Sequence, residues 1–247
     1  MAVEVIDINC DVGEGVGNEA QLFPFISSCS IACGGHAGDA QTIAQMLRLA
    51  LEHKVKVGAH PSYPDRANFG RKTLKMTPRA LKDSLAEQMG LITGLCDQLG
   101  VPLHHIKPHG ALYNDIARDE ALANLFFKAV APFAPNAVLY LLSGSKVVYW
   151  AKHRGFAVRE EAFADRNYNE DKGLMPRSEA NALITAPDRV LSHLLSIVKE
   201  GKVMVPGKTK VSLRADTFCV HGDTPTALQI LMYLHRELPK HQINLLP

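Results

Sequence analysis

The chain has 247 residues, of which 47% are hydrophobic and 21% charged, and its formal net charge is +2. This composition is typical of a globular protein with one large core and excludes a disordered chain. Lys and Arg are spread along the chain and aromatic residues make up only 6%, so we expect neither nucleic acid nor a membrane as a partner.

Short apolar runs alternate with amphipathic stretches along the chain. In chain order, strands are predicted at Val5–Cys10, Ser28–Cys33, Lys56–His60, His104–Lys107, Val138–Leu142, Ala157–Phe163 and Thr217–Val220. Helices are predicted at Ala40–His53, Pro78–Leu99, Glu120–Val130, Ser145–His153, Pro187–Glu200 and Pro225–Leu238. The expected helix N-caps are Asp39, Thr77 and Thr224. This alternation predicts parallel β/α units, either in an open sheet or in a closed barrel.

Polar side chains share one face of five of these strands and concentrate toward the carboxyl ends. They are Asp7, Asn9 and Asp11; His60; His105, Lys107 and His109; Glu161 and Asp165; His221 and Asp223. An open sheet would spread these groups over both flanks, whereas a barrel brings them to one mouth. We therefore predict an α/β fold, a single (β/α) barrel domain over residues 1–247 with about seven parallel strands. Its polar strand faces would point into the lumen and its apolar faces toward the helices.

The stretch "IACGGHAGD" contains a cysteine, two glycines and a histidine. Cys33 falls on the apolar face of its strand, which favours a packing role over a nucleophilic one. Gly34 and Gly35 are expected to form a tight turn, and His36 to begin the loop at the barrel mouth. The five cysteines form no Cys-x-x-Cys motif, and "MAVEVIDIN" is unlike a signal peptide. We expect a cytoplasmic protein without disulfides.

Two glycine-rich stretches resemble nucleotide-binding motifs without matching them. "GKVMVPGKT" has one residue too many between its glycines for a P-loop, and "GEGVGN" has its third glycine one residue early for a dinucleotide fingerprint. Any nucleotide contact must therefore use other groups. Basic residues in two loops after predicted strands are candidates for holding a carboxylate or a phosphate: Arg66, Arg71 and Lys72, then Arg166, Lys172 and Arg177.

Six blocks, "DINCDVGE", "SCSIACGGHAGD", "GAHPSYPD", "IKPHGALYN", "EAFADRNY" and "FCVHGDTP", resemble in order the signatures of the LamB/YcsF family of bacterial 5-oxoprolinase A subunits. One departure is Asn167, where the family has a basic residue. The resemblance implies a seven-stranded barrel akin to glycoside hydrolase/deacetylase barrels. It also implies ATP-dependent opening of the lactam 5-oxo-L-proline (pyroglutamate) to L-glutamate, in a complex with subunits B and C.

Lactam hydrolysis needs an activated water, stabilisation of an oxyanion and a protonated leaving nitrogen. In our hypothesis, the general bases are sought among Asp11, Glu161 and Asp165. Protons are carried by His60, His109 and His221. Lys107 stabilises negative charge, and Arg71 or Arg166 holds the substrate carboxylate. Further substrate contacts are assigned to Asn9, His36, Asn114 and Asp223.

The expected cofactors are ATP, bound here or by one of the partners, and the Mg²⁺ that accompanies ATP. We expect no tightly bound protein-ligated metal; if one is present, its ligands are Asp11, His60 and His109. Two alternatives remain open. One is a stand-alone metal-dependent deacetylase or amidohydrolase, and the other is a non-catalytic lactam-binding subunit.

Overall fold

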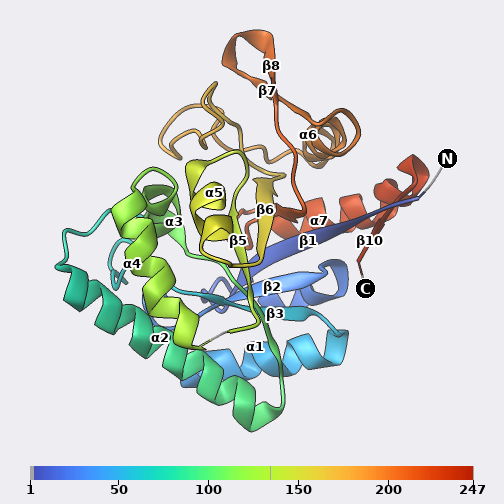
Figure 1. The fold of residues 1–247 in the computed structure, drawn as a ribbon. Helices are drawn as coiled ribbons and strands as arrows, with labels where there is room; N and C mark the ends of the chain where they lie inside the picture. The colour runs from blue at the N-terminus through green and yellow to red at the C-terminus, as the bar shows by residue number, and fades with distance from the viewer. Residues whose placement is uncertain (1–2, 134, 247) are drawn as a thin grey trace.

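The computed structural model describes residues 3–133 and 135–246 and contains a closed barrel of seven parallel strands, as predicted (Figure 1). Adjacent strands pair in chain order and β9 pairs with β1, which closes the barrel. The strands are β1 (Glu4–Val12), β2 (Ser28–Ala32), β3 (Lys56–His60), β4 (Leu103–Ile106), β5 (Val138–Leu142), β6 (Val158–Phe163) and β9 (Thr217–Cys219).

Helices surround the barrel, and most of them have the predicted bounds. They are α1 (Ala40–His53), α2 (Pro78–Leu99), α4 (Glu120–Val130), α5 (Lys146–His153), α6 (Pro187–Glu200) and α7 (Ala227–Glu237). Short 3₁₀ turns lie at Glu19–Gln21, Phe23–Phe25, Ala131–Phe133, Pro206–Lys208 and Leu238–His241.

Four elements were not predicted from the sequence. One is the short helix α3 (Gly110–Ile116). The strands β7 (Lys202–Val205) and β8 (Thr209–Ser212) form an antiparallel hairpin that projects beyond the barrel in Figure 1. The strand β10 (Ile243–Leu245) pairs in parallel with the amino-terminal part of β1. The "GKVMVPGKT" stretch thus belongs to a hairpin, in keeping with its exclusion as a P-loop.

The helix caps agree with prediction in two cases and disagree in one. Asp39 Oδ1 accepts the Thr42 N–H at 2.8 Å, and Thr77 caps α2 in the same way. The prediction for Thr224 is wrong, because the residue before α7 is Thr226. The Thr224 hydroxyl instead donates to the buried Asp165 carboxylate at 3.1 Å.

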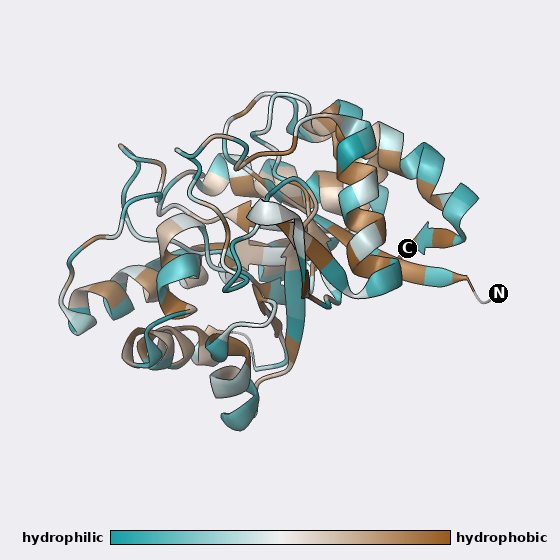
Figure 2. Ribbon diagram, turned by 90° about the horizontal axis from the view of Figure 1, so that it is seen from above, coloured by the Kyte–Doolittle hydropathy of each residue, from teal (hydrophilic) through white to brown (hydrophobic). Residues whose placement is uncertain are grey.

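The main core lies between the barrel and the helices, where the apolar faces of the strands meet the apolar faces of the helices. On β1, the side chains of Ile6, Ile8 and Cys10 join this core, whereas Asp7 and Asn9 are fully buried and contact residues of other strands. In Figure 2 the hydrophobic colour follows the strands and parts of the helices, and the loops carry much of the hydrophilic colour. The predicted division into polar lumen and apolar exterior is therefore confirmed on β1.

The polar residues deep in the lumen form a network that we call the lumen floor, comprising Asp7, Ser28, Ser30, His105, Tyr140 and Thr217. Asp7 Oδ2 accepts hydrogen bonds from the hydroxyls of Ser28, at 3.0 Å, and of Tyr140, at 3.3 Å, as well as from Thr217. The His105 ring stacks on Tyr140 with 3.9 Å between centroids. Gly58 leaves room for this ring, because a Cβ there would overlap it.

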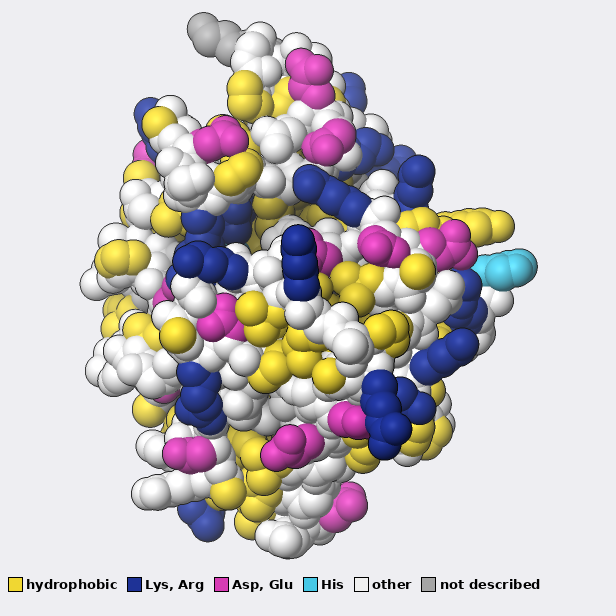
Figure 3. All heavy atoms as spheres, turned by 90° about the vertical axis from the view of Figure 1, so that its left-hand side faces the viewer, with side chains coloured by type: hydrophobic (Ala, Val, Ile, Leu, Met, Phe, Trp, Pro, Cys, Tyr) yellow, Lys and Arg dark blue, Asp and Glu magenta, His cyan; other side chains and the backbone are white. Residues whose placement is uncertain are grey.

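The molecular surface has a mixed character. On the face in Figure 3, Lys and Arg side chains are interspersed with Asp, Glu and apolar ones. Within residues 3–133 and 135–246, no helix combines the length and apolar character needed to cross a membrane.

Candidate active site at the barrel mouth

The carboxyl ends of the barrel strands bring most of the predicted site residues together. Lys107 and Glu161 lie at the base of this mouth and are almost completely buried. The Lys107 ammonium is 2.9 Å from Asp11 Oδ1, 2.9 Å from Glu161 Oε1 and 3.0 Å from Asn9 Oδ1. Glu161 also accepts from Asn9 at 2.9 Å and from the Tyr113 hydroxyl at 2.7 Å. Both Lys107 and Glu161 therefore have their hydrogen-bonding capacity taken up within the protein.

Asp11 is the carboxylate of this group that reaches the upper part of the mouth. Its Oδ2 lies 3.4 Å from His60 Nε2, while Oδ1 is held by Lys107. Burial alone would raise the pKa of Asp11, but His60 and Lys107 hold it well below its usual range. Burial alone would lower the pKa of Lys107, but Asp11 and Glu161 raise it well above its usual value. Both groups are thus charged at neutral pH.

Asp165 and His221 form a second pair on the β9 side of the mouth. The Asp165 carboxylate contacts His221 Nδ1 at 2.9 Å and accepts the backbone N–H of His221 at 3.0 Å. Burial alone would raise the pKa of Asp165, but His221 and Arg166 lower it to about 2. The carboxylate thereby holds the imidazole of His221, which is partly exposed at the mouth. One His221 nitrogen lies within 4.8 Å of an Asp11 oxygen.

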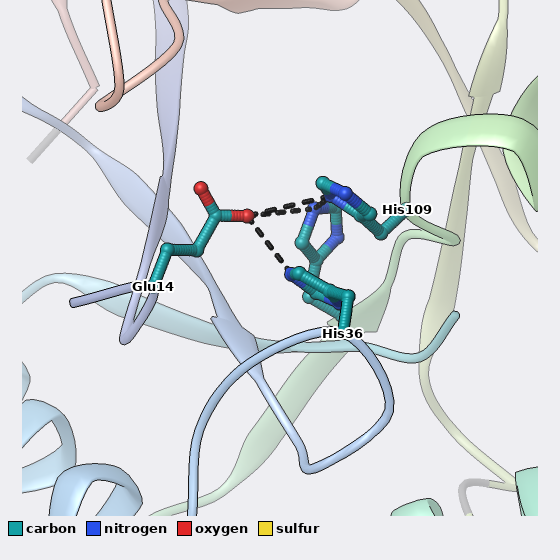
Figure 4. A group of neighbouring side chains, drawn as sticks. Glu14, His36 and His109 are labelled. Carbon is teal, nitrogen blue, oxygen red and sulfur yellow. Dashed lines mark hydrogen bonds and ion pairs between the residues drawn. The ribbon is translucent and has the colours of Figure 1, made fainter. Parts of the chain in front are cut away.

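Four further side chains converge above Asp11, and we call them the mouth cluster: Glu14, His36, His60 and His109. Glu14 Oε1 lies 3.0 Å from His36 Nε2 and 3.4 Å from His109 Nδ1 (Figure 4). It also lies 4.0 Å from His60 Nε2. His109 Nδ1 is 3.0 Å from His60 Nε2. The side chain of Glu14 is only 2% exposed. This is a compact set of three imidazoles and one carboxylate.

The mouth cluster has unusual electrostatics. Burial and the neighbouring Asp11 raise the pKa of Glu14 to about 7. Burial and the adjacent histidines lower the pKa of His36 and that of His109 well below the usual value. The two imidazoles are therefore neutral at pH 7 and present lone pairs.

Glycines explain how Glu14 and His36 reach the cluster. Gly13 and Gly15 on either side of Glu14 have positive φ, which turns the β1–β2 loop back over the mouth. Glu19 holds this turn, because its Oε1 accepts the backbone N–H of Glu14 at 2.6 Å. Before His36, Gly34 has the positive φ expected of a tight turn, and Gly35 is closely packed, because a Cβ there would overlap the side chains of Gln88 and Ser62.

Two arginines of the predicted site have different surroundings. Arg71 is partly exposed and pairs with Asp223, which is also 3.5 Å from Arg177. Arg166 is buried and donates to the backbone carbonyls of two residues in its own loop. Arg71 is therefore the better placed to hold a substrate carboxylate.

Two other predicted residues lie apart from the cluster. Asn114 is exposed on α3, where its side chain donates to the Gly110 carbonyl at 3.0 Å. Cys33 is fully buried, and burial raises its thiol pKa to about 12. This supports the prediction that Cys33 packs and does not act as a nucleophile. All five cysteines are free.

Glu14 was not among the site residues predicted from the sequence. Its position three residues after Asp11, in a loop that follows a barrel strand, was the available signal. The periodicity of strand side chains ends at Val12, however, and the positive φ of Gly13 and Gly15 decides where Glu14 points. The "GEGVGN" stretch, which resembles a nucleotide motif in sequence, thus supplies a carboxylate to the site.

Comparison with known proteins gives full-length matches. The sequence profile of the LamB/YcsF family matches residues 6–247. The A subunit of a 5-oxoprolinase from Bordetella pertussis is 43% identical over 228 residues, covering 90% of each chain. Its counterpart from Pyrococcus furiosus is 37% identical over 247 residues, covering 98% of this chain and 97% of that one. A crystal structure of a lactam utilization protein from Thermus thermophilus superposes with a TM-score of 0.87 at 35% identity, covering 98% of both chains.

Proposed function

We propose that this chain, which belongs to the LamB/YcsF family, opens the ring of 5-oxo-L-proline within a multi-subunit, ATP-hydrolysing 5-oxoprolinase. The names of its relatives, which are 5-oxoprolinase A subunits and a lactam utilization protein, support this proposal. The observation that carries it is the convergence at one mouth of the ionised Asp11, His60 and the His221–Asp165 pair. These are the groups that hydrolysis of an amide requires.

Asp11 is our candidate for activating water. Its Oδ1 is fixed by Lys107, and its Oδ2 is directed toward His60. His60 donates from Nδ1 to the Lys107 carbonyl at 2.7 Å, which directs its Nε2 toward Asp11 Oδ2 and His109 Nδ1. Asp11 can therefore orient a water and take its proton, while His60 helps to fix the position of its Oδ2. Glu161 and Asp165 are fully buried and already hydrogen-bonded, so we no longer assign either as the base.

Lys107 has a different role from the one expected. Its ammonium is 2% exposed and contacts Asp11, Glu161, Asn9 and Cys219, so that its partners outnumber its three N–H donors. It has no donor to spare for a phosphate or an oxyanion. We therefore assign Lys107 as a positioning residue that holds Asp11 ionised and oriented.

His221 is our candidate for protonating the leaving nitrogen. Asp165 fixes its Nδ1, so that the other ring nitrogen can exchange a proton with the substrate. Nearby, Arg71 and Arg177 share the single carboxylate of Asp223. Within this group of three side chains one positive charge is in excess, which suits the carboxylate of 5-oxoproline.

ATP activates the amide in this proposal. Transfer of the terminal phosphoryl group to the amide oxygen makes the ring carbon more electrophilic. A water then adds to that carbon, the carbon–nitrogen bond breaks and the nitrogen takes a proton. A second water releases phosphate from the acyl phosphate and leaves L-glutamate. Neither glycine-rich stretch of this chain has nucleotide-binding spacing, so we assign ATP and its Mg²⁺ to the partner subunits, named B and C in the family.

Omitting subunits one at a time tests the proposal. The readouts are ADP release and glutamate formation from 5-oxoproline, with this chain alone, the partner subunits alone, and all together. We expect glutamate only from the complete set. Glutamate formation by the partners alone would give this chain a binding role only. Amide or ester hydrolysis by this chain alone, without ATP, would favour a stand-alone amidohydrolase.

A further inference from the structure

The mouth cluster has an unusual distribution of protons. His60 Nδ1 lies 2.7 Å from the Lys107 carbonyl, and His109 Nε2 lies 2.9 Å from the Phe69 carbonyl. A carbonyl oxygen only accepts hydrogen bonds, so each of these outer nitrogens carries a hydrogen. In a neutral imidazole the inner nitrogen, His60 Nε2 or His109 Nδ1, is then a bare lone pair.

His36 follows the same pattern through a hydroxyl group. Its Nδ1 lies 3.0 Å from Ser62 Oγ, and Ser62 uses its own hydrogen to donate to the Tyr63 carbonyl at 2.9 Å. Ser62 Oγ therefore accepts from His36 Nδ1–H, and His36 Nε2 faces Glu14 without a hydrogen. Each of the three rings is held by an outer oxygen, the arrangement that orients histidine ligands of metals.

With all three rings neutral, the inner atoms are four acceptors directed at one another. They are Glu14 Oε1, His36 Nε2, His60 Nε2 and His109 Nδ1, and all lie within 4.8 Å of one another. Protons on Glu14 and on His60 Nε2 would satisfy two of these contacts, those of Glu14 with His36 and of His60 with His109. Buried acceptors without donors are unfavourable, and a cation placed among them would satisfy all four.

We propose that Glu14, His36, His60 and His109 bind one divalent transition-metal ion of the zinc type. Imidazole nitrogens with one carboxylate suit Zn²⁺ or its substitute Co²⁺, whereas Ca²⁺, Mg²⁺ and Mn²⁺ prefer oxygen ligands. Tetrahedral bonds of about 2.0–2.1 Å place neighbouring ligand atoms about 3.3 Å apart. The observed separations of 3.0, 3.0, 3.4 and 4.0 Å bracket that value.

One adjustment accompanies binding. The rings of His36 and His109 are stacked, with centroids 3.6 Å apart and planes within 3° of parallel. A single ion cannot lie in both ring planes, so at least one ring must tilt on coordination. The χ2 torsion of histidine has a broad energy well, and such a rotation is inexpensive. His60 is nearly perpendicular to both rings and needs no comparable change.

A second group with metal-like spacing, Asp11, Cys219 and His221, is a poorer candidate. The Lys107 ammonium is already 2.9 Å from Asp11 and 3.2 Å from Cys219 Sγ. A cation is thus built into the protein at that position. Replacing His221 would weaken metal binding by the second group but not by the mouth cluster, so a His221 variant distinguishes the two sites.

Metal binding by this chain alone tests the inference without lactam, ATP or partner subunits, so the outcome does not depend on the proposed function. The protein is stripped with a chelator, and Zn²⁺ is titrated calorimetrically. Co²⁺ is added separately and followed by its visible absorption. We expect one ion per chain and the intense bands of a four-coordinate Co²⁺ site.

The variants identify the ligands. His36→Ala, His109→Ala and Glu14→Gln should each weaken Zn²⁺ binding by about 10-fold or more. His221→Ala and the surface control His153→Ala should bind as the parent does. Circular dichroism in chelator checks the fold, and His36→Gln and His109→Gln replace any alanine variant that unfolds. No uptake by the parent protein, unchanged binding in the His36 and His109 variants, or loss of binding only in His221→Ala would overturn the proposal.

Discussion

The lumen floor and the mouth cluster are both buried and polar, yet their donors and acceptors are arranged in opposite ways. At the floor, hydroxyl donors converge on one acceptor, Asp7 Oδ2, and the Asn9 amide donates to Thr217 at 2.8 Å. At the mouth, one carboxylate oxygen and three imidazole nitrogens, each able to bind a cation, lie close together. The floor network therefore stabilises the barrel, whereas the mouth is arranged for a ligand that the protein does not itself supply.

Lys107 lies between the two regions, because its partner Asn9 contacts Thr217 of the floor and its partner Asp11 contacts His60 of the mouth cluster. Replacing Lys107 should have the largest effect on stability. Lys107→Met would leave Asp11 and Glu161 as buried carboxylates without their shared cation. We expect the free energy of unfolding to fall by about 3–5 kcal/mol in urea denaturation. The double variant Lys107→Met/Glu161→Gln, which removes one carboxylate, should recover part of this loss. A change under about 1 kcal/mol would show that the ion pairs do not hold the regions together.

A floor substitution should destabilise the barrel without affecting the mouth. Thr217→Val removes a donor to Asp7 and an acceptor for Asn9 at nearly constant volume. We expect a loss of about 1–3 kcal/mol in the free energy of unfolding, with Zn²⁺ binding unchanged. Thr226→Val, at an exposed hydroxyl, is the matched control and should change stability by less than about 0.5 kcal/mol. Equal effects of the two variants would contradict a stabilising role for the floor.

Acid should lower the free energy of unfolding through the Asp165–His221 pair. Because the pKa of Asp165 is lowered to about 2 from 3.8, its ionised form stabilises the folded state above pH 4, and this stabilisation is lost as the pH falls toward 2. Between pH 5 and pH 3 the loss from this group is about 1 kcal/mol. Urea unfolding at the two pH values should show that Asp165→Asn loses less stability than the parent. An identical loss in both proteins would contradict the assignment.

The smallest effect on stability is expected at Glu14. Glu14→Gln replaces an acceptor by an amide that can donate to the lone pairs of His36 and His109. In chelator, thermal unfolding of this variant should occur at the same temperature as in the parent or slightly above it, a difference within about 0.5 kcal/mol. A loss of about 2 kcal/mol would mean that Glu14 is a structural partner of the histidines, as Thr217 is of Asp7.

The barrel was predictable because its determinants are local and repeated. Apolar runs of four to six residues alternate with amphipathic helices, and the two-residue period on β1 separates Asp7, Asn9 and Asp11 from Ile6, Ile8 and Cys10. The convergence of the strand ends follows from closure of the barrel. The floor and Lys107 belong to this predictable part, since strand periodicity directs their side chains.

The remainder of the site depends on loops, where no such period applies. Glu14 reaches the histidines through a glycine turn, and Arg166 donates to carbonyls of its own long loop. Thr224 has an N-cap residue type but bonds to Asp165, because a buried carboxylate is the stronger acceptor. Each of these outcomes depends on contacts between residues far apart in the sequence, which a local pattern does not encode.

Glutamate formation by an Asp11→Asn variant is the most direct test that the mouth performs the chemistry. The substitution keeps the shape of the side chain but removes the charge next to His60 and Lys107. Assembled with its partner subunits and given 5-oxoproline and ATP, the folded variant should form glutamate at least about 100-fold more slowly than the parent. Glutamate formation within about twofold of the parent rate would contradict the account.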